Sequence, residues 1–328
     1  MKIFIFSLLL YLMVMQTAFC ATPSTLDNKR LEQQVAAAMG DAKKGDFKQL
    51  EAFESHREDV LPFLQKYVSY PNKNVQYMLI QLASNYTSDV SQELIIQEIA
   101  SSFPKVSKEA IFRIFYEPTK LNHKNQQLLK TNLLDYIQSR YDSPETILLL
   151  SRYHGDPEVI SALQEQRIKH PTAIVWLRNA PAIDLYTFYD IALAHLGDKE
   201  AVVRLKDVIS DAKVDNLVAI FGAQTLDTLE YVDNSSILSQ LVECIHDKRE
   251  TSIDIRVFSQ AVPFSYGIRS VAFERPHYQY LRVCDLALMT LIQKANIRIT
   301  GAPKLWDTNY TDDELNTGYT ALKTYFAK

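Results

Sequence analysis

Apolar residues recur at helical spacing along most of this chain. The clearest case lies in residues 183–211, where one apolar stripe is followed by a second after a very short turn. The first stripe consists of Leu185, Phe188, Tyr189, Ala192 and Leu196, and the second of Ala201, Val202, Leu205, Val208 and Ile209. This spacing predicts two amphipathic helices. Gly197 suits the left-handed end of the first helix, and Asp198 suits the N-cap of the second.

Similar helices are predicted along most of the remaining chain. Helix-start and helix-stop residues divide it into segments of ordinary helix length, with Gly155-Asp156-Pro157 as the plainest boundary. The predicted segments are 27–44, 46–54, 56–70, 73–86, 88–99, 107–117, 122–140, 143–154, 157–169, a less regular 170–181 around Trp176, 215–221, 223–231 and 235–247. A helix pair with one stripe per helix needs like neighbours to bury both stripes. The expected fold class is therefore all-α, as an α–α superhelix.

One helix pair also resembles a known family. The order Ala192, Leu193, Leu196, Gly197, Asp198, Glu200, Ala201, Leu205 and Ile209 is similar to a HEAT-like repeat of the phycobilin-lyase type. The resemblance implies a HEAT/armadillo-like solenoid. It implies no activity, because one scaffold of this kind hosts many functions.

The first twenty residues read as a signal peptide. Lys2 precedes the apolar run 3–15, which is short for a membrane span, and Ala18-Phe19-Cys20 predicts cleavage after Cys20. A lipid anchor would need Cys20 as the first mature residue, and Phe19 is bulky for that motif. We expect a periplasmic or secreted protein with no membrane span, folded as one solenoid over residues 21–328.

The helical pattern breaks near the C-terminus. Apolar residues alternate from Thr251 to Val257, and Pro263, Gly267 and Pro276 follow. These signals predict an insertion at 248–276, irregular or forming a β-hairpin near 251–276. A helix is expected again over 278–295. The segment Thr311–Glu314 then forms a capping box that opens a C-terminal cap helix at 311–327.

The insertion is the best candidate for a binding site. Residues 248–282 combine a surplus of basic residues with six aromatic ones in a chain of formal charge −4. Arginine and aromatic residues are typical of binding hot spots. The candidate residues are Arg249, Arg256, Phe264, Tyr266, Arg269, Phe273 and Arg275. The alternative is that this segment packs back over the last helices.

Motifs for catalysis, metals and cofactors are absent from the sequence. There is no HExxH, GxSxG, phosphate loop or EF-hand loop, and the seven histidines are scattered singly. We therefore expect no catalytic residue, no metal and no cofactor. After cleavage the cysteines are Cys244 and Cys284, and two alternatives stay open for them: a disulfide, or two buried thiols.

The expected function is non-catalytic protein binding in the bacterial cell envelope. A protein or peptide partner fits better than nucleic acid, because the chain is acidic and exported. One specific form is an immunity-type protein that neutralises a secreted toxin. Two other classes stay open: an enzyme whose site is not visible in the sequence, and a purely structural envelope scaffold.

Overall fold

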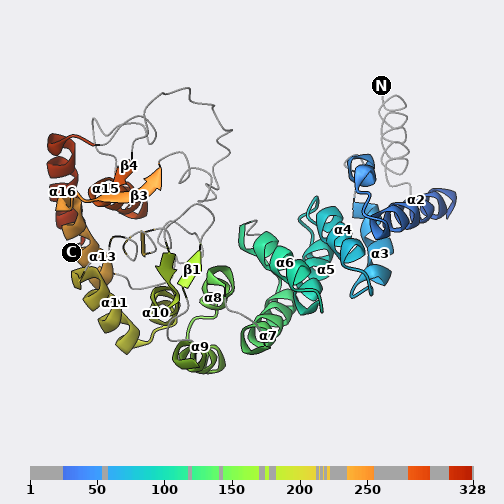
Figure 1. The fold of residues 1–328 in the computed structure, drawn as a ribbon, viewed down its shortest axis with the longest axis horizontal. Coiled ribbons are helices and arrows are strands. Elements are labelled where there is room, and N and C mark those ends of the chain that lie inside the picture. The colour runs from blue at the N-terminus through green and yellow to red at the C-terminus, as the bar shows by residue number, and fades with distance from the viewer. Residues whose placement is uncertain are drawn as a thin grey trace, which may run out of the picture. The chain divides into compact units, whose positions relative to one another are not determined.

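The described part of the chain is built almost entirely from helices, which confirms the all-α fold class (Figure 1). The computed structural model describes residues 25–53, 58–116, 120–139, 143–169, 174–176, 182–211, 214, 217, 220–221, 235–254, 280–295 and 310–326. Within these ranges no helix combines the length and the apolar character needed to cross a lipid bilayer. The chain divides into two compact units, Met1–Leu128 and Leu129–Lys328, which are taken in turn.

The first unit consists of α-helices joined by short turns and 3-10 segments. In order they are α2 (Thr25–Lys43), η1 (Lys48–Phe53), η2 (Glu58–Val60), α3 (Leu61–Leu64), η3 (Gln65–Tyr67), α4 (Lys73–Ala83), α5 (Asp89–Gln97), η4 (Glu98–Ala100) and α6 (Pro104–Tyr116). Helix α7 (His123–Ser139) contains the boundary between the units. The predicted α-helices at 46–54 and 56–70 are wrong in type, because short 3-10 turns interrupt or replace them.

Polar caps set the helix starts in this unit. The side chain of Asn72 accepts the backbone N–H groups of Asn74 and Val75, and Ser88 accepts that of Ser91. Asn122 accepts the backbone N–H of Asn125 at 2.8 Å. Each cap satisfies donors that the first helical turn leaves without an intrahelical partner. At the end of α2, Gly45 has a φ of +89°, the left-handed conformation that glycine adopts without strain.

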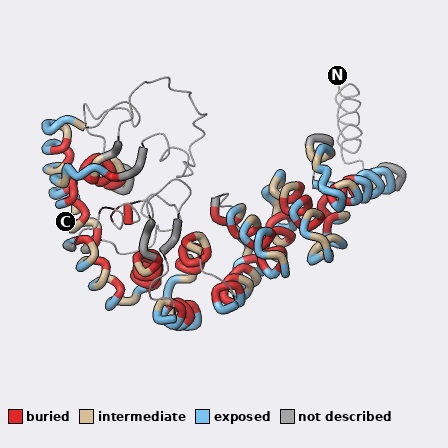
Figure 2. Tube along the Cα trace, viewed as in Figure 1, coloured by how far each residue is buried: buried red, intermediate tan, exposed pale blue. Residues whose placement is uncertain are grey.

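The core of the first unit runs along α4. This helix packs against α2, α5 and α6, and it buries Val75, Met78, Leu79 and Leu82. Figure 2 shows buried and exposed positions alternating around α4, α5 and α6, as expected for helices that cover a core with one face.

The second unit contains more helices and two short strand pairs. Its elements are α8 (Pro144–Leu150), α9 (Pro157–Lys169), β1 (Ile174–Trp176), β2 (Ala182–Asp184), α10 (Leu185–His195), α11 (Lys199–Asp211), α13 (Ser235–Glu243), η6 (Cys244–His246), β3 (Glu250–Asp254), β4 (Tyr280–Arg282), α15 (Val283–Ala295) and α16 (Asp312–Phe326). Among the described residues of this unit, buried apolar side chains are most numerous on α7, α8, α10 and α15.

The predicted helix pair at 183–211 is confirmed. Gly197 has a φ of +99°, and the carboxylate of Asp198 accepts the N–H groups of Glu200 and Ala201 at 2.8 and 3.2 Å. Helix α10 packs against α8, α9 and α11, and its residues are buried on nearly every side (Figure 2). This corrects the amphipathic pattern predicted for the first helix, because α10 lies in the core and buries Thr187, Asp190 and His195 as well as its apolar residues.

Two strand pairs correct the sequence-based prediction. β1 and β2 pair antiparallel with Val175 opposite Ile183, where a less regular helix was expected around Trp176. β4 occupies Tyr280–Arg282, so the helix expected from 278 begins at Val283 instead. Ile174-Val-Trp176 is rich in β-branched and aromatic residues, which favour strands, but three residues are too few to show a period.

Candidate functional site

Residues 247–254 and 280–284 form the base from which the predicted insertion leaves the helical fold. Strand β3 pairs antiparallel with β4, placing Glu250 opposite Arg282 and Asp254 opposite Tyr280. Below the strands, the N–H of Val283 donates to the carbonyl of Arg249 at 3.0 Å. The N–H of Cys284 donates to the carbonyl of Asp247 at 2.8 Å. The chain therefore leaves for residues 255–279 and returns from them at one place, and the strand-like pattern predicted from Thr251 is confirmed for β3.

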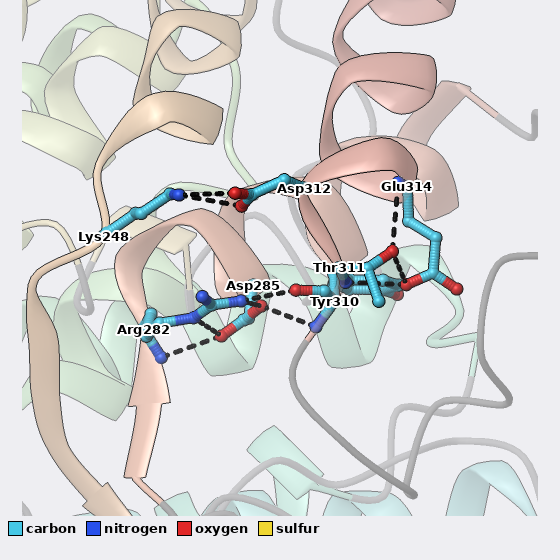
Figure 3. A network of polar contacts seen from close by, with 7 residues as sticks. All are labelled: Lys248, Arg282, Asp285, Tyr310, Thr311, Asp312 and Glu314. Atoms are coloured by element: carbon cyan, nitrogen blue, oxygen red, sulfur yellow. Dashed lines mark hydrogen bonds and ion pairs between the residues drawn. The ribbon is translucent and has the colours of Figure 1, made fainter.

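A buried carboxylate fixes the returning strand to the helices beyond it (Figure 3). The Nε and Nη2 groups of Arg282 donate to the two carboxylate oxygens of Asp285, each at 2.8 Å. Nη2 of Arg282 also donates to the carbonyl of Tyr310 at 2.6 Å, and the N–H of Tyr310 donates to Asp285 at 3.0 Å. The side chain of Asp285 is only 3% exposed. Such a paired, hydrogen-bonded arrangement is what a buried charge requires.

The C-terminal helix is attached to the same base. Lys248 lies 2.8 Å from a carboxylate oxygen of Asp312, the first residue of α16 (Figure 3). This contact holds the pKa of Asp312 below its ordinary value. Thr311 and Glu314 exchange hydrogen bonds, since Glu314 accepts the Thr311 N–H at 2.7 Å and donates its own N–H to the Thr311 hydroxyl at 3.3 Å. The predicted capping box is confirmed.

Charged and polar groups at the base stabilise one another. The carboxylate of Asp285 raises the pKa of the Arg282 guanidinium, so this group stays charged. Burial, together with the Asp285 charge, raises the pKa of the Tyr310 phenol to about 12. Figure 3 shows two ion pairs, Lys248 with Asp312 and Arg282 with Asp285, and these can hold the chain segments together.

The structure places one predicted binding residue at this base. Arg249 is exposed and donates from Nε to both carboxylate oxygens of Asp247, at 2.9 and 3.1 Å. This hydrogen bonding lowers the pKa of Asp247. The six other candidates lie outside the described residues, namely Arg256, Phe264, Tyr266, Arg269, Phe273 and Arg275. Sequence reasoning missed Asp285 and Tyr310. The one local signal for the Arg282–Asp285 ion pair was that these two oppositely charged residues are three positions apart.

The two cysteines lie at the base or next to it. Cys244 lies in η6 and Cys284 in the first turn of α15, two elements that pack against each other. Both side chains are buried, and the structure contains no bond between them. Burial raises the pKa of each thiol to about 11. At neutral pH both therefore hold their protons and are poor nucleophiles.

A second polar cluster joins three consecutive helices of the second unit. Asp190 of α10, nearly fully buried, accepts two hydrogen bonds from Arg167 of α9, at 2.9 and 3.0 Å. It also accepts one from Nε of Arg204 of α11 at 2.7 Å. The guanidinium of Arg167 lies over the ring of Tyr186, 4.8 Å from its centroid. Sequence analysis did not predict this cluster, because its members lie on three different helices.

Histidines and metals add little to the site. Nδ1 of His154 lies 2.8 Å from the carbonyl oxygen of His195, so it donates a hydrogen bond between the turns that follow α8 and α10. Among the residues that the structure describes, no three His, Cys, Asp or Glu side chains gather as a metal site would require.

No protein-family model, curated protein or solved structure matches this chain.

Proposed function

We propose that this protein is an exported, non-catalytic α-helical solenoid that binds a protein or peptide partner through residues 248–282. One observation carries the proposal: the described ends of this segment are held together by hydrogen bonds of the fold. β3 pairs with β4, and the Arg282–Asp285–Tyr310 cluster fixes β4 to the helices that follow.

The chemistry of the segment supports a protein partner. Arg256, Arg269 and Arg275 occur among residues 255–279 together with four Phe and Tyr residues before position 278, in a protein that is acidic overall. Arginine and aromatic side chains bury much area while keeping polar reach, which is why they dominate binding hot spots.

The packing of the second unit supports the solenoid part of the proposal. α10 packs against α8, α9 and α11, and α11 packs in turn against α13. Each helix thus contacts its neighbours in sequence, as in repeat proteins. The signal-peptide pattern in residues 1–20 supports export, and the HEAT-like order of residues 192–209 supports the type of repeat.

The proposal is tested by crosslinking the protein in its source cells and identifying what is captured. The variant Arg256→Ala/Tyr266→Ala/Arg269→Ala is expected to lose a stoichiometric partner while keeping its melting temperature. A matched control, Arg30→Ala/Lys199→Ala/Tyr325→Ala, removes similar side chains from exposed positions of α2, α11 and α16. This control is expected to capture the partner as the unmodified protein does.

Two outcomes would contradict the proposal. If the triple variant melts at a clearly lower temperature, the segment packs as part of the fold. If the unmodified protein captures no stoichiometric partner although it is folded and abundant, it is not a dedicated protein-binding module.

A further inference from the structure

A second surface of this protein has the chemistry of a binding site, and it lies in the first unit. On α4, Lys73, Tyr77 and Gln81 follow one another at four-residue steps and thus share one side of the helix. On α6, the helical period places a second group on the side opposite the buried residues. This group comprises Lys105, Lys108, Glu109, Phe112 and Arg113. We call these eight residues together the α4–α6 face.

Hydrogen bonds join the two helices into one surface. Nε2 of Gln81 donates to Glu109 at 3.0 Å, and Nη2 of Arg113 donates to the amide oxygen of Gln81 at 3.0 Å. Arg113 also donates from Nε to Glu109 at 3.0 Å. The side chains of Gln81, Glu109 and Arg113 are thereby held in fixed positions at the centre of the face. A preordered surface loses less conformational entropy on binding.

The face carries a surplus of positive charge. Its single carboxylate, Glu109, already bonds to Arg113. Lys73, Lys105 and Lys108 are exposed, and none of them forms an ion pair within the described part of the chain. This is a local feature, because basic and acidic residues are equal in number over residues 21–128.

Some lysines on neighbouring elements of the same unit are paired within the chain. Lys66 pairs with Glu32 at 2.9 Å, and Lys124 pairs with Glu93 of α5 at 2.7 Å. Within the described ranges, Lys73, Lys105 and Lys108 are not paired in this way, so their charges are open to the carboxylates of another molecule.

Aromatic rings lie among these cations. The side chains of Tyr77 and Phe112 are 38% and 46% exposed, which is unusual for such large groups in a packed helical fold. The ring of Phe47 meets that of Tyr77 edge to face, with centroids 5.9 Å apart. Tyr77 is therefore held against the surface and does not project from it, so it offers a flat ring to a ligand.

We infer that the α4–α6 face binds an acidic peptide segment of a partner protein, one that also carries aromatic or aliphatic side chains. Its carboxylates meet Lys73, Lys105 and Lys108, and its apolar groups cover Tyr77 and Phe112. An anionic phospholipid surface shares the negative charge, and the test below distinguishes it from a peptide. This surface is independent of the proposal for residues 248–282, since its residues all lie in the first unit.

The test is selection from a random peptide library displayed on phage, with the purified protein immobilised. Selected peptides are expected to be rich in Asp and Glu together with Phe, Tyr, Leu or Ile. The variant Lys73→Glu/Lys105→Glu/Lys108→Glu is expected to lose this enrichment. A synthetic consensus peptide should bind it about tenfold or more weakly in fluorescence anisotropy, and the loss should diminish as salt is added.

A matched control keeps the test specific. Lys29, Lys43 and Lys120 are also exposed and lie outside the face, on or next to α2 and α7. Reversing their charges to Glu alters the net charge equally and should leave the peptide affinity within about twofold. A milder variant, Lys73→Gln/Lys105→Gln/Lys108→Gln, serves if the Glu variant fails to fold, and it should also bind less tightly.

Several outcomes would overturn the inference. They are enrichment of neutral or basic peptides, equal loss of affinity in the control variant, and binding to vesicles of anionic phospholipid without binding to the peptides. The variant Arg256→Ala/Tyr266→Ala/Arg269→Ala should bind the consensus peptide normally, so failure of one proposal leaves the other intact.

Discussion

Glu98 in the first unit and Asp190 in the second are both buried carboxylates, and the two are satisfied in different ways. Asp190, in the second unit, receives three hydrogen bonds from the guanidinium groups of Arg167 and Arg204. Glu98, in the first unit, receives one at 2.9 Å from the backbone N–H of Ser69. The other oxygen of Glu98, Oε2, has no hydrogen-bond partner within the described residues.

The difference shows up in the proton affinity of Glu98. Burial raises its pKa to about 7, and the Ser69 N–H offsets this only in part. A buried carboxylate without a cationic partner takes up a proton, whereas one that is held by arginines joins helices as an anion. The same chemical group, a carboxylate, thus pairs with arginines in one unit and forms a proton-sensitive contact in the other.

The largest effect is expected from breaking the ion pairs of Asp190. Asp190→Ala removes the common partner of Arg167 and Arg204, and it leaves two partly buried cations without compensation. The free energy of unfolding should fall by about 3–5 kcal/mol, measured by urea denaturation followed by circular dichroism. Glu200→Ala is the control: this carboxylate is 89% exposed and 3.8 Å from Arg204, and its loss should cost less than about 0.5 kcal/mol. Equal losses of unfolding free energy in the two variants would show that Asp190 stabilises the fold no more than an exposed carboxylate does.

The next effect concerns the pH dependence of the first unit. The pKa of Glu98 in the folded state, about 7, exceeds its ordinary value of 4.5, so folding strengthens proton binding. This group's stabilising contribution is complete below about pH 4.5 and is lost as the pH rises through 7. The free energy of unfolding should decrease by roughly 3 kcal/mol over that window.

Glu98→Gln tests this assignment, because the amide keeps the acceptor for Ser69 and cannot ionise. Hydrogen exchange of peptides from α4 and α5, corrected for the intrinsic effect of pH, should lose protection with rising pH in the unmodified protein. The Glu98→Gln variant should show a flat profile over the same window. Parallel profiles in the two proteins would assign the proton to another group.

The smallest effect is expected at Ser69, whose backbone N–H donates the hydrogen bond to Glu98. Ser69 has a φ of +54°, the left-handed conformation that residues with a Cβ adopt at a cost. Ser69→Gly removes that cost and should stabilise the unit by about 0.5 kcal/mol, since the greater freedom of glycine in the unfolded chain offsets part of the gain. Ser69→Ala keeps the Cβ and should be neutral. Both values can be read from chemical denaturation at about pH 5, where Glu98 is protonated.

Local signals explain what the sequence predicted well. The caps at Asn72 and Asp198, the glycine at 197 and the Thr311–Glu314 box each involve residues within a few positions of one another, so sequence alone carries them. The pair β1–β2 escaped because strands of three residues are too short to show a period, and β4 escaped because its pairing depends on a distant segment. β4 spans three residues directly before α15, and its partner β3 lies beyond residues 255–279.

The candidate site was predictable only in its location. Composition and alternation pointed to residues 248–282, and the base of that segment is where the strands were found. Arg282–Asp285–Tyr310 and Arg167–Asp190–Arg204 could not be picked out, because a carboxylate on a solvated helix face has the same sequence signature as a buried one. Burial is decided by packing between distant helices.

The paired strands at the base also affect how the sequence of this protein can evolve. Because β3 and β4 pair next to the Arg282–Asp285 ion pair, the fold specifies where residues 255–279 begin and end, whatever lies between. Closing a longer connection costs little, since doubling its length adds only about 0.6 kcal/mol of entropy. Under the proposed function, a change in the length or sequence of this stretch would alter what the protein recognises while the paired ends of the stretch stay the same.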